Sequence, residues 1–135
     1  MKFLCLIYAD EKALAALREY RSLSDECLAY SAALDRQGIC LASAALESVE
    51  SATTLRVRDG RVSITDGPFA EAREQLAGFY LIEADGLHEA LHLAADIPLA
   101  RVGSIELRPV RSLPRAQFGE AASRGFRRVP EWLES

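Results

Sequence analysis

The chain has 135 residues, half of them hydrophobic and 27% charged, the composition of an ordinary globular protein with one core. Its formal net charge of -4 argues against nucleic-acid binding as a main role, because contacts to phosphate groups need basic patches. The apolar run near the N-terminus, Phe3 to Tyr8, has the length of a strand and is too short for a membrane span or a signal peptide.

The three cysteines, Cys5, Cys27 and Cys40, are widely spaced and form no CxxC pair. Neither a zinc site nor a redox motif is indicated, so we expect no metal and no other cofactor. Cys5 and Cys40 lie in apolar runs and are interpreted as small core residues. Unpaired thiols of this kind predict a cytoplasmic protein with reduced cysteines.

In chain order, the first predicted element is a strand over residues 2–8. Its nearly continuous apolar run predicts burial on both faces in the middle of a sheet. Residues 12–20 are expected to form a short helical piece. A longer helix is expected to begin at Ser22 or Ser24 and to end at Gly38. Its buried side is predicted from four residues at helical spacing: Leu23, Cys27, Tyr30 and Leu34.

Residues 39–42 are predicted to form a short second strand. The clearest local pattern follows, because two alternating segments, residues 54–58 and 61–65, flank the dipeptide Asp59-Gly60. This pattern is typical of a β-hairpin with a two-residue turn. The hairpin is expected to have an apolar face and a basic face, with Leu55 and Val57 on the first and Arg56 and Arg58 on the second.

The stretch over residues 65–80 holds the densest cluster of special residues in the chain. Asp66-Gly67-Pro68 is strong turn chemistry, because aspartate bonds its own following backbone, glycine accepts a positive φ and proline fixes φ. A charged run then leads into an apolar strand predicted over residues 77–84. Aromatic side chains and a carboxylate beside such a bend suit a ligand-binding loop, and they also occur in ordinary loops.

A further helix is predicted over residues 86–96, capped by Asp85 and closed by Pro98. Its buried face is expected to comprise Leu87, Ala90, Leu91 and Ala94. The last strand is predicted over residues 104–110, where apolar and charged residues alternate. One face of that strand is therefore expected to be wet or shared with a partner.

The order of strand, helix, strand, hairpin, strand, helix and strand predicts an α+β fold, a ferredoxin-like βαββαβ arrangement with an inserted β-hairpin. Such sheets leave one face uncovered by helices, and a homodimer that stacks two sheets is the symmetric way to cover it. From residue 111 the composition shifts to Pro, Arg and Gly with scattered aromatic residues. We therefore expect a domain over residues 1–110 and a C-terminal extension, 111–135, that packs on the same domain or on the partner subunit.

Several segments are specific enough to be considered together: Met1 to Tyr8, Thr65-Asp66-Gly67-Pro68-Phe69, Glu74-Gln75-Leu76, Gly78-Phe79-Tyr80-Leu81-Ile82-Glu83, Ile97-Pro98-Leu99-Ala100 and Gly103 to Val110. They resemble the DGPF subgroup of the YCII-related family over about residues 1–110. The resemblance implies a bacterial, dimeric α+β barrel of ferredoxin-like subunits, with a cleft at one end of each sheet. It also implies an unknown function, because most members have no established activity.

Some members of that family carry a histidine and aspartate pair in the cleft that was proposed to be catalytic. This chain departs from that pattern, because Tyr30 stands on the first long helix and Asp96-Ile97-Pro98 replaces the family's Asp-Pro motif. The proposed chemistry is therefore not carried over. The residues that do match the subgroup are Asp66, Gly67, Pro68, Phe69, Glu74, Gln75 and Gly78.

Asp66 and Glu74 are the candidate catalytic residues. Asp66 can orient or deprotonate a ligand, or it can hold the turn before Pro68 as an Asx turn. Glu74 is a candidate acid or base if the cleft encloses it, and otherwise a solvated or ion-paired loop carboxylate. The candidate ligand-binding residues belong to the same loop or stand at strand ends where the implied cleft opens: Tyr8, Gly67, Pro68, Phe69, Gln75, Gly78 and Arg108.

His88 and His92 are four residues apart on a predicted helix, a spacing that can hold a metal ion. They have no obvious third ligand, so we interpret them as two partly exposed imidazoles and predict no metal site. The arginines of the hairpin, Arg56, Arg58 and Arg61, can recognise an anion or simply form one solvated strand face.

Two functions of different class fit these observations. The first is a cofactor-independent cleft that binds or transforms a small molecule, such as a carboxylate, by acid/base chemistry. The second is a non-catalytic dimeric module associated with sigma-factor or transcription regulation, as the resemblance implies for some DGPF members. An enclosed pocket with convergent polar groups favours the first function, and a filled cleft favours the second.

Overall fold

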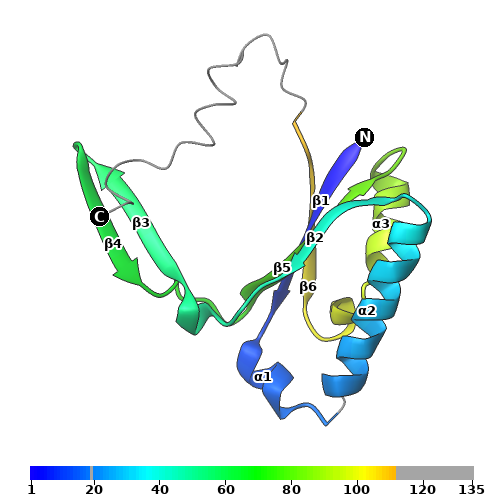
Figure 1. Ribbon diagram of the computed structural model, residues 1–135, viewed down its shortest axis with the longest axis horizontal. Coiled ribbons are helices and arrows are strands. Elements are labelled where there is room, and N and C mark those ends of the chain that lie inside the picture. Colours follow the sequence, from blue (N-terminus) through cyan, green and yellow to red (C-terminus); the bar gives the residue numbers. More distant parts are fainter. Residues whose placement is uncertain (19, 112–135) are drawn as a thin grey trace.

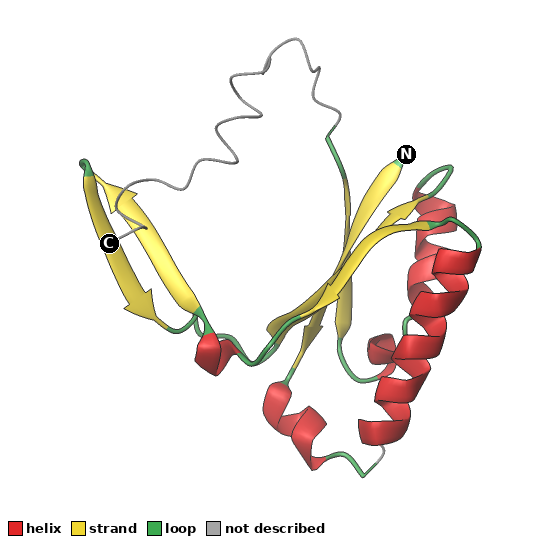
Figure 2. Ribbon diagram, in the orientation of Figure 1, coloured by secondary structure: helices red, strands yellow, loops and turns green. Residues whose placement is uncertain are grey.

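The computed structural model describes residues 1–18 and 20–111, so all but the first residue of the predicted C-terminal extension lies outside the described residues. In chain order the elements are β1 (Lys2–Ala9), α1 (Glu11–Ala16), α2 (Tyr20–Arg36), β2 (Cys40–Ala45), the 3-10 helix η1 (Val49–Ser51), β3 (Thr53–Arg58), β4 (Arg61–Asp66), β5 (Gln75–Glu83), α3 (Leu87–Ala95), the 3-10 helix η2 (Pro98–Arg101) and β6 (Ser104–Pro109). Strands in the order β2-β5-β1-β6 form one antiparallel sheet, and β3 and β4 form a separate hairpin (Figures 1 and 2). The predicted α+β fold, ferredoxin-like with an inserted hairpin, is confirmed.

Strand β1 lies between β5 and β6, in the middle of the sheet as predicted. One of its faces is fully buried beneath the helices, through Phe3, Cys5, Ile7 and Ala9. The other face, formed by Leu4, Leu6 and Tyr8, is only partly buried. The prediction of burial on both faces is thus wrong for the described chain, because the helices cover one side of the sheet and leave the other to solvent.

We call this second side the open sheet face. Residues opposite one another in the ladder share a face, so the register extends the face across three strands. Leu4 is opposite Leu81, Leu6 is opposite Phe79, and Leu4 and Leu6 are also opposite Arg108 and Glu106. The open sheet face therefore has an apolar centre on β1 and β5 and a charged border on β6.

Helix α2 packs Leu23 and Leu34 into the core, with Cys27 and Tyr30 partly buried beside them, as the helical spacing predicts. The helix begins at Tyr20, so the prediction that Ser22 or Ser24 caps it is wrong. Ser24 lies inside the first turns and its hydroxyl donates to the carbonyl oxygen of Tyr20, four residues back. Gly38, with φ of 69°, follows the helix end as predicted.

Helix α1 is shorter than the predicted piece over residues 12–20, because Leu17 is already extended. Asp10 starts the helix by accepting hydrogen bonds from the backbone N–H groups of Lys12 and Ala13. Within the described part of the chain, none of these helices is both long and apolar enough to cross a membrane.

The prediction that Asp85 caps α3 is wrong, because Gly86 occupies the N-cap position. The backbone N–H of Asp85 instead donates to the Glu89 carboxylate. Ala90 and Ala94 are buried as predicted, but Leu87 and Leu91 are 54% and 49% exposed. The prediction for these two leucines is wrong. The small side chains of the alanines face the sheet and place the leucines on the flank of α3.

The β3–β4 hairpin is confirmed, with a two-residue turn in which Asp59 and Gly60 have φ of 52° and 75°. It projects on the side of the main sheet opposite to α2 and α3 (Figure 1). Two hydrogen bonds close its base: the N–H of Gly67 donates to the Ala52 carbonyl at 2.7 Å, and the Thr54 hydroxyl donates to the Gly67 carbonyl at 2.7 Å.

Candidate functional site

A cavity of about 960 Å³ lies between α1, the first half of α2 and the β2–β5 edge of the sheet. Leucine and alanine side chains supply much of its lining, including Leu14 from α1, Leu23 from α2 and Leu46 beyond β2. Pockets of this size and apolar character are the usual form of small-molecule sites. The helix face of the sheet therefore carries a hollow with the size and lining of a small-molecule site.

The floor of the cavity carries a chain of hydroxyl groups. The Ser31 hydroxyl lies 2.7 Å from the Tyr80 phenol oxygen, and it donates to the Cys27 carbonyl oxygen at 3.0 Å. Since Ser31 has a single hydroxyl proton, which goes to Cys27, Tyr80 is the donor to Ser31. Tyr80 then keeps a free accepting lone pair on its oxygen.

Tyr80 remains a neutral phenol in this setting. Burial, the largest influence on this group, raises its pKa. Its ring meets the Tyr30 ring edge-to-face, with centroids 5.4 Å apart, and the Tyr30 hydroxyl donates to the Leu93 carbonyl at 2.6 Å. Packing on α2 and α3 thus fixes the orientation of the Tyr80 ring.

Glu11 is the one carboxylate that lines the described cavity wall. Its two oxygens accept hydrogen bonds from the Ser48 hydroxyl at 2.8 Å and from the Val49 N–H at 2.9 Å. These two hydrogen bonds therefore hold η1 against the start of α1. No lysine, arginine or histidine of the described residues lines the cavity, so it offers a ligand no positive charge.

Cys27 also contributes to the wall. Burial raises the pKa of its thiol, and the neighbouring Glu26 carboxylate raises it further. The Cys27 side chain is therefore a neutral thiol at neutral pH, and it adds to the uncharged character of the lining.

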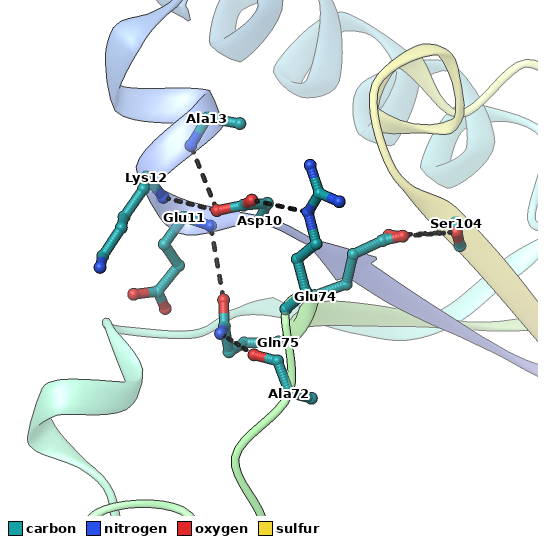
Figure 3. A network of polar contacts seen from close by, with 9 residues as sticks. Asp10, Glu11, Lys12, Ala13, Ala72, Glu74, Gln75 and Ser104 are labelled. Atoms are coloured by element: carbon teal, nitrogen blue, oxygen red, sulfur yellow. Dashed lines mark hydrogen bonds and ion pairs between the residues drawn. The ribbon is translucent and has the colours of Figure 1, made fainter.

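A second polar cluster lies at the end of the main sheet (Figure 3). Glu74, just before β5, accepts a hydrogen bond from the Ser104 hydroxyl at 2.8 Å, at the start of β6. Gln75 accepts from the Glu11 N–H at 3.4 Å and donates to the Ala72 carbonyl. These contacts join the starts of β5, β6 and α1.

The sequence model of the YCII-related domain family matches residues 1–114 of this chain. The chain belongs to the YCII-related family. An uncharacterised protein of Rhizobium meliloti (strain 1021) is 48% identical over 69 residues, which are 50% of this chain and 56% of that protein. The match thus spans little more than half the length of this curated relative. The family predicted from the sequence is confirmed, and the DGPF subgroup remains a prediction.

In this YCII-related chain the predicted site residues are distributed over several places. Gly78 is the one predicted residue that lines the 960 Å³ cavity within the described chain. Gly67, Pro68 and Gln75 line a smaller hollow of about 340 Å³ beside η1. Phe69 is 77% exposed.

The remaining predicted residues lie elsewhere. Tyr8 and Arg108 lie on the open sheet face, where the Arg108 guanidinium pairs with the Glu106 carboxylate at 2.6 Å. Asp66 is exposed at the end of β4, and neither Asp66 nor Glu74 lines the 960 Å³ cavity. A catalytic role for these two carboxylates remains a prediction.

His88 and His92 stack edge-to-face on α3, with ring centroids 4.7 Å apart, and both are exposed. Across residues 1–18 and 20–111, no three His, Cys, Asp or Glu side chains gather as a metal site requires.

The hydroxyl groups on the cavity floor were not among the residues predicted from the sequence. One signal pointed to them, because Ser31 follows Cys27 by four residues and precedes Leu34 by three. A serine within the buried stripe of an amphipathic helix needs a hydrogen-bond partner. That partner is Tyr80, and only the fold brings it to α2.

Proposed function

We propose that this YCII-related protein binds a small, uncharged and largely apolar molecule in the cavity between α1, α2 and the β2–β5 edge. The observation that carries the proposal is the lining: apolar side chains surround a floor of hydroxyl groups, with no cationic residue of the described chain on the wall. Apolar walls give affinity through buried area, and a few placed polar groups give orientation.

The hydrogen bonds on the floor define the ligand further. Tyr80 donates to Ser31, so its oxygen retains capacity to accept. A ligand that presents an O–H or N–H group to Tyr80 makes a hydrogen bond there, while a ligand with only acceptors does not. We therefore favour a neutral hydrogen-bond donor on an apolar body, such as a phenol.

A carboxylate ligand fits the wall poorly. An anion placed in the cavity loses its hydration without gaining a cationic partner, which is costly in an apolar setting. The Glu11 carboxylate adds repulsion at the same wall. The sequence-based prediction of the ligand allowed a carboxylate. The cavity lining instead favours neutral molecules.

The proposal concerns binding and assigns no reaction. Glu11 has both oxygens engaged, and the Tyr80 phenol and the Cys27 thiol are neutral at neutral pH. The alternative of a non-catalytic dimeric module in sigma-factor regulation remains a prediction from the resemblance.

The test compares three probes with one ring system: 1-naphthol, naphthalene and 1-naphthoate, titrated against the full chain by fluorescence and calorimetry. We expect 1-naphthol to bind with a dissociation constant on the order of micromolar, and naphthalene roughly tenfold more weakly. We expect no measurable binding of 1-naphthoate. Preferential binding of 1-naphthoate, or failure of all three probes, contradicts the proposal.

Two substitutions on α1 locate the binding site. Ala15 lines the cavity, whereas Ala13 does not, and both are exposed. Ala15→Phe is expected to occlude the cavity and abolish binding of 1-naphthol, and Ala13→Phe is the matched control that retains it. Equal binding by both variants would place the probe elsewhere on the protein.

A further inference from the structure

We propose that residues 10–17, which include α1, form a strap that opens and closes over the cavity, and that the Glu11 carboxylate is the clamp that holds the strap in place. Closure of the strap rests on the proposed function, because it acts on a molecule bound in the cavity. The clamp can be tested without any ligand, so its failure is distinguishable from a failure of the binding proposal.

The strap is attached to the rest of the chain without a buried side chain. It follows Ala9, which is fully buried at the end of β1, and none of residues 10–17 is buried. The next buried residue of the described chain is Leu23 on α2. A helix of six residues is not stable by itself in water, and segments with few buried apolar contacts open locally at a low cost in free energy. The strap can therefore open while the sheet and the other helices stay folded.

One side of α1 faces the cavity. Glu11, Leu14 and Ala15 line the cavity, and their spacing of three and four residues places them on the same side of the helix. Leu14 is only partly buried and Ala15 is exposed. A molecule with an apolar body in the cavity buries more of these two side chains, so its binding favours the closed position of the strap.

Hydrogen bonds at the first turn of α1 hold the strap in the closed position. The Glu11 carboxylate accepts from the Ser48 hydroxyl at 2.8 Å and from the Val49 N–H at 2.9 Å, which both lie across the cavity wall at η1. The Glu11 N–H also donates to the Gln75 side chain at 3.4 Å (Figure 3). Hydrogen bonds to a charged acceptor are the stronger kind, so the carboxylate contributes most to this hold.

The other contacts of the strap are weaker. Asp10 pairs with the Arg73 guanidinium at 3.6 Å, and the arginine side chain is 93% exposed, so this ion pair contributes little. At the far end of the strap, the Tyr20 N–H donates to the Leu17 carbonyl oxygen at 3.4 Å, which is a long hydrogen bond. Loss of the Glu11 carboxylate is therefore expected to shift the strap toward its open position.

Hydrogen exchange of the full chain, measured by mass spectrometry of its peptides, tests the clamp without a ligand. In Glu11→Ala, exchange in peptides that cover α1 and η1 is expected to accelerate by about three- to tenfold, because the hydrogen bonds that the carboxylate accepts are lost. Glu11→Gln keeps one accepting oxygen and is expected to show a smaller acceleration. Lys12→Ala is the matched control, because Lys12 lies in the same turn but does not line the cavity.

Exchange in α3 separates opening of the strap from loss of the whole fold. Helix α3 carries buried residues of the core and is expected to exchange at the parent rate in all three variants. Equal acceleration in α1 and α3 of Glu11→Ala would overturn the proposal, because the strap would then open only when the whole protein unfolds. Equal exchange of α1 in Glu11→Ala and Lys12→Ala would also overturn it, because the carboxylate would then not be a clamp.

Addition of 1-naphthol tests the closure. In the parent protein, saturating 1-naphthol is expected to slow exchange of α1 by at least about threefold and to leave α3 unchanged. The dissociation rate of 1-naphthol, measured by stopped-flow fluorescence, is expected to rise by about three- to tenfold in Glu11→Ala and to stay unchanged in Lys12→Ala.

The two proposals fail in different ways. If calorimetry shows that 1-naphthol binds and the exchange of α1 does not change, the closure is refuted while the proposed function stands. If 1-naphthol does not bind, the proposed function and the closure both fail, and the ligand-free comparison of Glu11→Ala with Lys12→Ala still decides whether Glu11 is the clamp.

Discussion

The phenol oxygen of Tyr80 lies 2.7 Å from the hydroxyl oxygen of Ser31, and this contact joins the sheet to α2 across the cavity floor. The Ser31 hydroxyl donates to the Cys27 carbonyl oxygen, so the hydrogen bonds run from Tyr80 to Ser31 to Cys27. Tyr80 is the first donor of this chain, and its oxygen can still accept a hydrogen bond from a ligand. The polar specificity of the proposed site therefore depends on one oxygen atom.

Tyr80→Phe removes that oxygen and keeps the ring. We expect the dissociation constant of 1-naphthol to rise by roughly three- to tenfold, which corresponds to one lost hydrogen bond, while naphthalene binds as before. Tyr30→Phe is the control, because it also loses a buried hydroxyl contact but does not line the cavity. Equal effects of both variants on 1-naphthol would show that Tyr80 acts only through stability.

Gly78→Ala tests the close approach of β5 to β2 where the main sheet forms a wall of the cavity. A Cβ atom on Gly78 would stand 2.6 Å from the Ala44 carbonyl oxygen of the neighbouring strand, and neither strand can move freely. We expect a loss of about 1–3 kcal/mol in the free energy of unfolding, measured by urea denaturation.

The control for this substitution is Gly86→Ala. A Cβ atom there meets nothing within 4 Å, and the extended backbone of Gly86 suits any residue. We expect a change below about 1 kcal/mol, from the weaker N-cap alone. If both alanine variants unfold at the same urea concentration, the contact with Ala44 does not constrain the strand.

Much of the fold was predictable because its signals are local. Asp59-Gly60 between alternating segments specifies the hairpin, and Gly38 with a positive φ marks the end of α2. Helix starts were predicted less well. Several serines near residue 20 are equally suitable N-cap residues by sequence alone. The residue at which α2 begins depends on how the helix packs.

The candidate site was less predictable because it depends on contacts between distant residues. Ser31 and Tyr80 are 49 positions apart, and no spacing rule links them. Asp66 and Glu74 were predicted from a motif whose glycine, Gly67, has a structural role, because its backbone closes the base of the hairpin. Gly78 is the predicted residue that the fold brings to the cavity.

The alkylation rate of Cys27 measures how accessible the cavity is. The pH dependence of this rate follows from the surroundings of the thiol. Burial raises the pKa of this thiol, and the thiolate is the reactive form. We therefore expect Cys27 to react with iodoacetamide more slowly than a free thiol at about pH 8, and the rate to keep rising as the pH passes the ordinary value for cysteine.

Peptide mapping separates the three thiols in this experiment. Saturating 1-naphthol is expected to slow the reaction of Cys27 and to leave Cys40 unchanged, because Cys40 does not line the cavity. Cys5 is fully buried with a pKa of about 11, so it reacts only when the protein opens. Equal protection of Cys27 and Cys40 would indicate a global effect and not occupancy of the cavity.

Two neighbouring substitutions separate the structural role of the loop from a chemical one. Gly67 has φ of 98°, a conformation that alanine adopts only with strain, so Gly67→Ala is expected to cost more than about 1 kcal/mol of stability. The open space around its Cβ position means that the cost comes from the backbone and not from a neighbouring atom. Asp66→Asn is the control, and its melting temperature is expected to match that of the parent because the exposed side chain keeps its size and its accepting oxygen.

The same Asp66→Asn variant, together with Glu74→Gln, decides whether these carboxylates have a chemical function. Neither residue lines the cavity, so 1-naphthol is expected to bind both variants like the parent. Glu74→Gln retains an oxygen that accepts from Ser104, so the contact between β5 and β6 is expected to persist with little change in stability. A turnover assay with any substrate found for the protein completes the comparison. Full activity in both variants would exclude Asp66 and Glu74 as catalytic residues, whereas loss of activity with unchanged stability and unchanged binding would assign them a catalytic role.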